Sequence, residues 1–171
     1  MSTVPQHVVE NTWRRVGSMA PSAARRAMEA ASSRQPALLA YVLASTSESR
    51  RAVQELAVYL YYVVLQMFEL GTAVRLVQVE PEAVERHGSR NEKLLVDLQS
   101  AHPRIMDRVG QVEVSRQLHV MRYVCEALFE EAEPGSDVKL KDDELGLLFL
   151  VLKTAVDALD EAGSDQQGGP A

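Results

Sequence analysis

The sequence predicts an all-α fold, a helical bundle of five to seven helices, from its composition and from the spacing of its apolar residues. The 171 residues include only nine Gly and seven Pro, which fall mostly between segments with helical apolar spacing. A fold of many short strands would need turn residues about every 8–12 positions. The hydrophobic fraction of 46% suffices for one core, and the aromatic fraction of 5% leaves Leu, Val, Ala and Met to build it.

The segment Glu55–Glu69, ELAVYLYYVVLQMFE, is the most apolar stretch of the chain. Between Leu56 and Phe68 only Gln66 is polar, if the tyrosines are counted as apolar. The run is shorter than the roughly 20 residues that cross a bilayer, so it predicts a buried core helix and no membrane segment. We expect the other helices to pack around it.

Proline and apolar spacing together predict the helix boundaries. Proline is favoured in the first turn of a helix, where its missing N–H would have no intrahelical partner. The expected helices lie near residues 5–18, 21–32, 36–44, 48–69, 81–102, 103–132 and 142–162. Glycine weakens a helix, so we expect a break or kink at His87–Arg90 and another at Gly110.

The ends of the central helix follow from local signals. Thr46 or Ser47 is expected to cap its start with a side-chain oxygen. The apolar spacing of TAVRLVQV would let the helix continue past Gly71 to Gln78, until Pro81 forces a new start.

The last helix begins with three acids, Asp142 to Glu144, where the helix dipole favours negative charge. Its solvent-facing stripe is expected to consist of Gly146, Leu150, Lys153, Asp157 and Asp160. Because two of these five are not polar, the first half of the helix is apolar nearly all round. This predicts burial on several sides or at a subunit contact.

Three parts are expected along the chain: an N-terminal helical arm at 1–34, a helical bundle domain at 35–162 and a disordered tail at 163–171. The arm carries the only Trp, and either packs on its own domain or reaches onto a partner subunit. Gly, Gln and Ser dominate the tail, which has too few apolar residues to fold.

An internal repeat is suggested by two short matches. QPALLAYV at 35–42 aligns with QLHVMRYV at 117–124, and ELA at 55–57 then meets ELG at 144–146. Either the bundle consists of two pseudo-repeated helical hairpins, or two amphipathic hairpins are alike by chance. Both readings give antiparallel hairpins that bury each other's apolar faces.

The net charge of −6 is unevenly distributed: residues 1–51 carry +4 and residues 131–171 carry −7. Opposite ends could attract each other within or between chains, but solvated helix faces explain the pattern more simply. The Arg pairs near the N-terminus lack any nucleic-acid-binding motif, and the pI of 5.3 also argues against a nucleic-acid partner.

Motifs for chemistry are missing from the sequence. The four His residues do not occur in H-E-x-x-H, and no Walker, Rossmann or G-x-S-x-G pattern is present. We therefore predict no enzyme, no catalytic residues, no cofactor and no metal site. The single cysteine, Cys125, lies on an apolar stripe and is expected to be structural. One cysteine and the absence of an export signal predict a cytoplasmic location.

The polar stripe of the central helix suggests a contact surface. It holds Tyr59, Tyr62 and Gln66, and a phenol with an apolar body suits a partner contact or pocket rim. The alternative is that the arm or another helix of the chain covers both tyrosines.

The leading functional prediction is a non-enzymatic interaction or scaffold module, a homodimer or a partner of another protein. Its expected interface residues are Trp13, Tyr59, Tyr62, Gln66 and Leu150. The alternative is a sensor or carrier of a small apolar ligand, with a cavity between the hairpins. That cavity would be shaped by Tyr41, Met67, Met106, Met121 and Tyr123.

Overall fold

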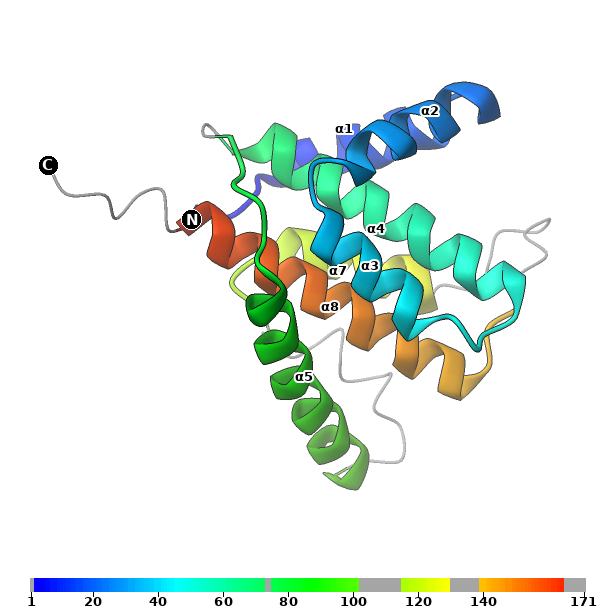
Figure 1. The fold of residues 1–171 in the computed structure, drawn as a ribbon, viewed down its shortest axis with the longest axis vertical. Coiled ribbons are helices and arrows are strands. Elements are labelled where there is room, and N and C mark those ends of the chain that lie inside the picture. The colour runs from blue at the N-terminus through cyan, green and yellow to red at the C-terminus, as the bar shows by residue number, and fades with distance from the viewer. Residues whose placement is uncertain (1, 73–74, 102–114, 130–138, 165–171) are drawn as a thin grey trace, which may run out of the picture.

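The computed structural model describes residues 2–72, 75–101, 115–129 and 139–164, and the regular structure within these residues is entirely helical (Figure 1). The predicted all-α bundle is confirmed, with seven helices in the described ranges. They are α1 (Gln6–Gly17), α2 (Pro21–Ser32), α3 (Pro36–Ser45), α4 (Arg51–Gly71), α5 (Pro81–Ala101), α7 (Leu118–Phe129) and α8 (Asp142–Ser164).

Prolines mark the helix starts. Pro21, Pro36 and Pro81 are the first residues of α2, α3 and α5, and Pro5 is the N-cap of α1. Because proline presets a helical φ and lacks only an N–H that would be unpaired there, these positions suit it. The expected break at Gly110 lies outside the described residues.

The start of α4 differs from the prediction. The N-cap is Arg50, which makes no side-chain capping bond, so neither Thr46 nor Ser47 caps this helix. The Thr46 hydroxyl instead donates to the Val42 carbonyl oxygen, 2.9 Å away, at the end of α3. Arg50 pairs with Glu144 at the start of α8, and this hydrogen bond and the Lys141 N–H lower the pKa of Glu144 to about 2.

The predicted continuation of α4 to Gln78 is wrong. α4 ends at Gly71, and residues 75–80 are not helical. The reason is tertiary: the side-chain amide of Gln35 bonds to the backbone here, and its oxygen accepts the N–H of Val79 at 2.9 Å. A helix would direct that N–H to its own preceding turn.

The predicted break at His87–Arg90 is also wrong, because α5 runs through it without interruption. Gly88 is buried in this helix, and a Cβ there would lie 3.7 Å from the Tyr41 hydroxyl oxygen and 3.9 Å from Thr154 Cγ2. The packing of α5 against its neighbours offsets the helix propensity that glycine lacks, about 1 kcal/mol relative to alanine.

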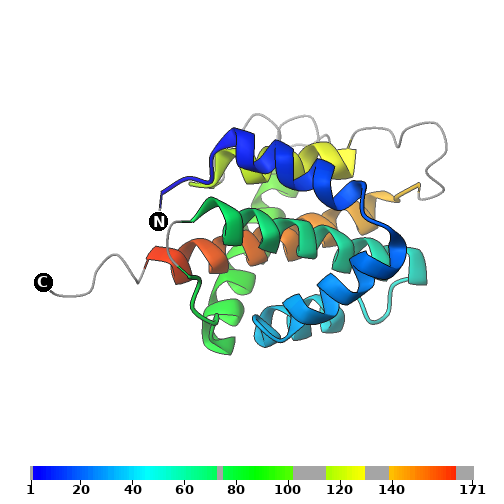
Figure 2. The same ribbon diagram turned by 90° about the horizontal axis from the view of Figure 1, so that it is seen from above.

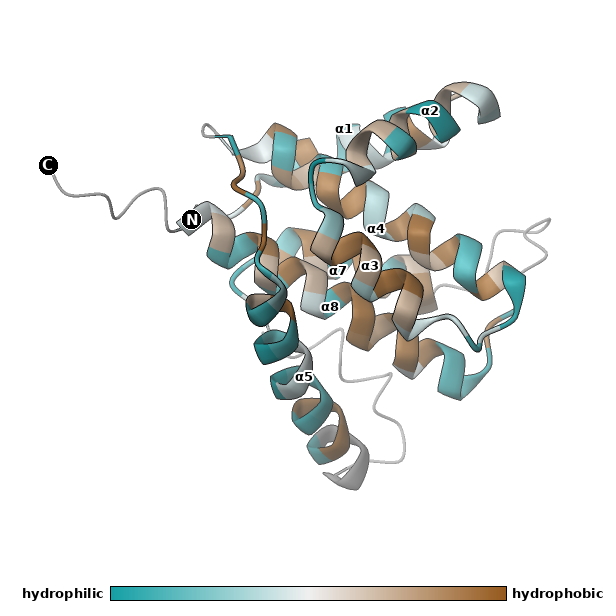
Figure 3. Ribbon diagram, in the orientation of Figure 1, coloured by the Kyte–Doolittle hydropathy of each residue, from teal (hydrophilic) through white to brown (hydrophobic). Residues whose placement is uncertain are grey.

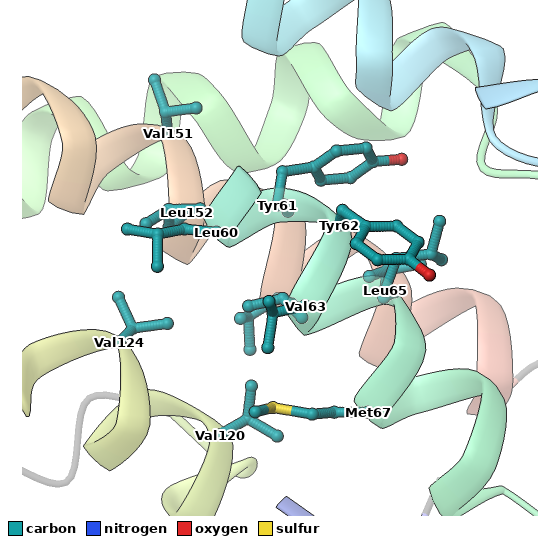
Figure 4. Packing of buried hydrophobic residues seen from close by; sticks show 14 of the residues in the cluster. Leu60, Tyr61, Tyr62, Val63, Leu65, Met67, Val120, Val124, Val151 and Leu152 are labelled. Atoms are coloured by element: carbon teal, nitrogen blue, oxygen red, sulfur yellow. The ribbon is translucent and has the colours of Figure 1, made fainter. Parts of the chain in front are cut away.

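Two long helices, α4 and α8, pack against each other in the middle of the molecule (Figure 2). α1 covers α4, α5 covers α8, and α3 and α7 lie on opposite sides of this pair. In Figure 4, Val63 and Met67 of α4 point toward Val120 of α7, whereas the rings of Tyr61 and Tyr62 point away from α7. None of the described helices combines the length and hydropathy needed to span a membrane.

The stripe of α8 that we expected to face solvent is partly buried. Lys153 and Asp160 are 3% and 8% exposed, and Asp157 is half-buried. The cause is that α5 and α7 both pack on this helix. In its first half, Leu148 and Phe149 are buried, which agrees with the predicted burial on several sides.

The first two helices pack on the same chain to different extents. α1 contacts α4 and α7, and it buries Val9, Thr12 and Val16. α2 contacts α4, and Ala31 is the one residue of this helix that is fully buried. Figure 1 shows α2 extending beyond the edge of the bundle.

Candidate functional site

The predicted contact stripe of α4 faces α1 and the segment that follows α2. Arg15 of α1 donates to Gln66 Oε1 at 3.1 Å, and Gln66 donates to Glu69 Oε2 at 2.6 Å. Arg34 binds both oxygens of Glu69, at 2.5 and 2.9 Å. The polar groups of Gln66 and Glu69 are therefore hydrogen-bonded to Arg15 and Arg34 of the same chain.

The two predicted tyrosines are not equally accessible. Tyr62 is only 4% exposed, whereas Tyr59 is half-buried. Burial raises the pKa of both hydroxyls, as it does for Tyr61. The Tyr61 hydroxyl is buried and has no hydrogen-bond partner among the described residues.

The remaining predicted interface residues lie on other helices. Trp13 of α1 is 42% exposed, and the guanidinium of Arg14 lies 5.5 Å from its ring centroid. Leu150 of α8 is half-buried. Because Tyr62 is buried, the five predicted residues do not form one exposed patch, and their role in a partner contact stays a prediction.

A different apolar surface is exposed on α3. The outer face of α3 consists of Pro36, Ala40, Leu43 and Ala44, which are all exposed and follow helical spacing. α3 has no charged side chain at all, and Leu43 is 49% exposed. A helix that is apolar all round is normally buried on every side, so this face is unusual for a surface.

α7 provides an internal comparison for α3. When Gln35 is aligned with Gln117, Val42 and Val124 are both fully buried. Burial differs at the next position, where Leu43 is 49% exposed and Cys125 is buried. The repeat that the sequence suggested thus pairs some residues in similar environments. Whether the two copies arose by duplication stays a prediction.

The two helices differ on their exposed faces. The positions of Ala40 and Ala44 in α3 correspond to Arg122 and Glu126 in α7, and all four residues are exposed. α7 therefore has the charged outer face expected of a solvated helix, whereas α3 does not.

Gln35 and Gln117 also make matching contacts, which we call the glutamine clamps. The Gln35 amide accepts from Val79 N at 2.9 Å and donates to Val77 O at 2.8 Å. It thereby holds the extended segment that leads into α5. Gln35 is 2% exposed, so both bonds are shielded from water.

The second clamp holds the segment that leads into α1. Gln117 accepts from Val4 N at 2.8 Å and donates to Ser2 O at 3.4 Å and to Asp160 Oδ1 at 2.6 Å. Val4 is fully buried, and a Cβ on Gly71 would lie 2.6 Å from Val4 Cγ1. The alignment of the two glutamines was visible in the sequence, but their bonding partners were not.

A buried polar cluster joins α5 to α8. Lys153 Nζ donates to Asp157 Oδ2 at 2.6 Å, and Asn91 donates to the same oxygen at 3.0 Å. Asn91 also bonds to Thr154 Oγ1 at 3.2 Å. Lys153 and Asp157 stood in the sequence as an i, i+4 pair, and their partner on α5 was the part that sequence reasoning missed.

One turn away, Glu161 of α8 accepts from Arg86 and from His87 Nε2, the latter at 2.7 Å. Burial opposes the charged carboxylate, but these two hydrogen bonds outweigh it and lower the pKa of Glu161. His87 Nδ1 is buried and has no partner among the described residues. The cluster and this pair together fix α5 against α8.

The cysteine and the methionines considered in the sequence analysis lie in the following surroundings. Burial, with the charge of Glu126, raises the pKa of the buried Cys125 thiol to about 11, so it is protonated near neutral pH. Within the described ranges, no three His, Cys, Asp or Glu side chains are close enough to hold a metal ion. Met67 and Met121 belong to the packed core, and Met106 lies outside the described residues.

Comparisons of this chain with protein-family models, with curated proteins and with solved structures found no match.

Proposed function

We propose that this protein is a non-enzymatic helical interaction module that forms a homodimer through the outer face of α3. The observation that supports this is an exposed helix face without charge, in a chain whose corresponding helix α7 has Arg122 and Glu126 at the matching exposed positions. Complete burial of a fully exposed leucine contributes about 1.5–3 kcal/mol. Leu43 is 49% exposed, so covering this face would gain part of that energy.

The isologous symmetry of a homodimer fits an uncharged helix well. In a twofold interface each residue faces a copy of the same patch, so like charges near the axis would oppose each other. Ala40 and Ala44 are small and uncharged, which lets two copies of α3 approach closely.

Light scattering after gel filtration tests this function. We expect the mass of the wild-type chain to approach twice 18.9 kDa at micromolar concentration. Ala44→Glu should weaken the dimer about tenfold or more, because it places a charge in the contact, and tenfold corresponds to about 1.4 kcal/mol.

The matched control is Ala127→Glu. Ala127 is an exposed alanine near the end of α7, so the same substitution carries the same helix-dipole penalty. The dimer affinity of the Ala127→Glu variant should equal that of the wild type. A wild-type chain that stays at the monomer mass up to about 100 μM would contradict the proposed function, since that concentration exceeds the Kd of a specific dimer.

A further inference from the structure

The outer face of α3 is too small to hold two chains together alone. A helix of ten residues is about 15 Å long and about 10 Å wide, whereas a stable interface buries roughly 800 Å² on each partner. A dimer centred on α3 must therefore include the elements on either side of it. In Figure 1, α2 lies on one side of α3 and the start of α5 on the other. α5 contacts α3 directly, whereas α2 packs on α4.

α2, which residues 33–35 connect to α3, presents unpaired positive charge. Arg25 and Arg26 are exposed, and neither has a hydrogen bond or ion pair within the described part of the chain. They border a shallow depression that Pro21 and Ser22 also line. The one acid of α2, Glu29, is exposed and leaves the helix net positive.

The start of α5 presents unpaired negative charge on the other side. Glu80, Glu82 and Glu85 are exposed, and they too have no ion pair with any described residue. The nearest base along α5, Arg86, is engaged by Glu161 of α8. The first clamp, Gln35 with Val79, fixes this acidic turn beside the N-terminal end of α3.

A twofold axis through α3 would bring these opposite charges together. Figure 3 shows the apolar α3 between the hydrophilic parts of α2 and α5. The twofold axis would run through the outer face of α3, perpendicular to the helix. Rotation of a second copy by 180° about this axis places its α5 opposite the first α2, and its α2 opposite the first α5. The order of positive α2, apolar α3 and negative α5 is thus self-complementary. One dimer would contain two α2–α5 contacts between opposite charges.

We propose that the partner of the α3 face is a second copy of this chain, selected by pairing of Arg25 and Arg26 with Glu82 and Glu85 of the other protomer. The inference rests on the proposed function, since without a dimer these charges have nothing to select. Exposed ion pairs each contribute little affinity, so they act mainly on specificity and association rate. Added salt should weaken the dimer by screening them.

Charge reversal with mixing tests the pairing. Two variants are needed, Arg25→Glu with Arg26→Glu, and Glu82→Arg with Glu85→Arg. Each alone should weaken its own homodimer about tenfold or more at low salt, because like charges then meet at both contacts. Mixed in equal amounts, they should form a heterodimer close to wild-type affinity, because both contacts again join opposite charges. Native mass spectrometry counts the three species, and thermal unfolding checks that each variant is folded.

The outcomes separate the two proposals. A wild-type dimer whose affinity neither reversal changes would overturn the charge pairing and leave the proposed function standing. Weakened homodimers without a restored heterodimer would overturn it as well. A monomeric wild-type chain would contradict the proposed function itself, and the light-scattering experiment detects that case before any charge variant is made.

Discussion

At the scale of single residues, Lys153 is the least expected feature of the molecule. Its side chain is 4% exposed, although an ammonium group loses several kcal/mol of solvation on burial. Asp157 lies one turn further along α8, and its Oδ2 accepts a hydrogen bond from Lys153 Nζ at 2.6 Å. Asn91 of α5 bonds to the same oxygen, so the pair is held from a second helix.

Removal of one member of this pair should be costly, and removal of both should not. Asp157→Leu leaves the Lys153 ammonium buried without an acceptor, and such changes destabilise by about 3–5 kcal/mol. In Lys153→Met with Asp157→Leu, apolar groups of similar volume replace both charges, so part of this loss should be recovered. The recovery is incomplete because the buried Asn91 amide also loses its acceptor on Asp157, which costs about 1–3 kcal/mol. Urea unfolding of the wild type and the two variants measures the difference. A double variant as unstable as the single one would show that the two charges stabilise the fold through contacts other than their own ion pair.

The sequence could not reveal this cluster because a helical projection shows only which residues share a face. Lys153, Asp157 and Asp160 were correctly placed on one stripe of α8, but the stripe was assigned to solvent. α5 and α7 bury it, and Asn91 of α5 lies 66 positions from Asp157. Contact between such distant segments depends on the packing of the whole bundle.

At the scale of helices, local signals predicted more than distant ones. Pro21, Pro36 and Pro81 marked three helix starts, because the effect of proline on φ and on the backbone N–H is local. Gly88 led to the wrong prediction of a helix break. Its low helix propensity is a weak preference, which the packing of α5 on α8 overrides. The end of α4 was missed because a side-chain amide from another helix decides it.

The glutamine clamps should each stabilise one extended segment and leave the other unaffected. Gln35→Leu keeps the side-chain volume but leaves the buried Val79 N–H without an acceptor, and an unsatisfied buried group costs about 1–3 kcal/mol. Hydrogen exchange at Val79 should therefore become faster, while exchange at Val4 should not change. Gln117→Leu should have the reverse effect, so each variant is the control for the other. Equally faster exchange at both amides would mean that each substitution lowers only the global stability and does not release one segment.

At the scale of the whole molecule, the contacts of α1, α3 and α4 mirror those of α5, α7 and α8. α1 packs on α4 as α5 packs on α8, and α3 packs on α5 as α7 packs on α1. The sequence suggested a repeat of hairpins, but the correspondence of α1 with α5 was not visible in it. When Val4 is aligned with Val79, Val9, Glu10 and Arg15 match Val84, Glu85 and Arg90. These matches are too few to stand out before the packing relates the two helices.

Residues 1–73 and 74–171 should be unable to fold separately, because each of these two segments covers apolar helix faces of the other. α4 and α8 bury their apolar faces against each other, and each glutamine clamp joins one segment to the other, Gln35 to Val79 and Gln117 to Val4. Fragments 1–73 and 74–171 should therefore show no cooperative thermal unfolding alone. Mixed, they should recover the helical circular dichroism and a single unfolding transition, since apolar burial is the main favourable term in folding. The same fragments with Val4→Asp should fail to associate, because a carboxylate would replace the buried side chain against Gly71. A fragment that unfolds cooperatively by itself would instead identify an independent domain with its own core.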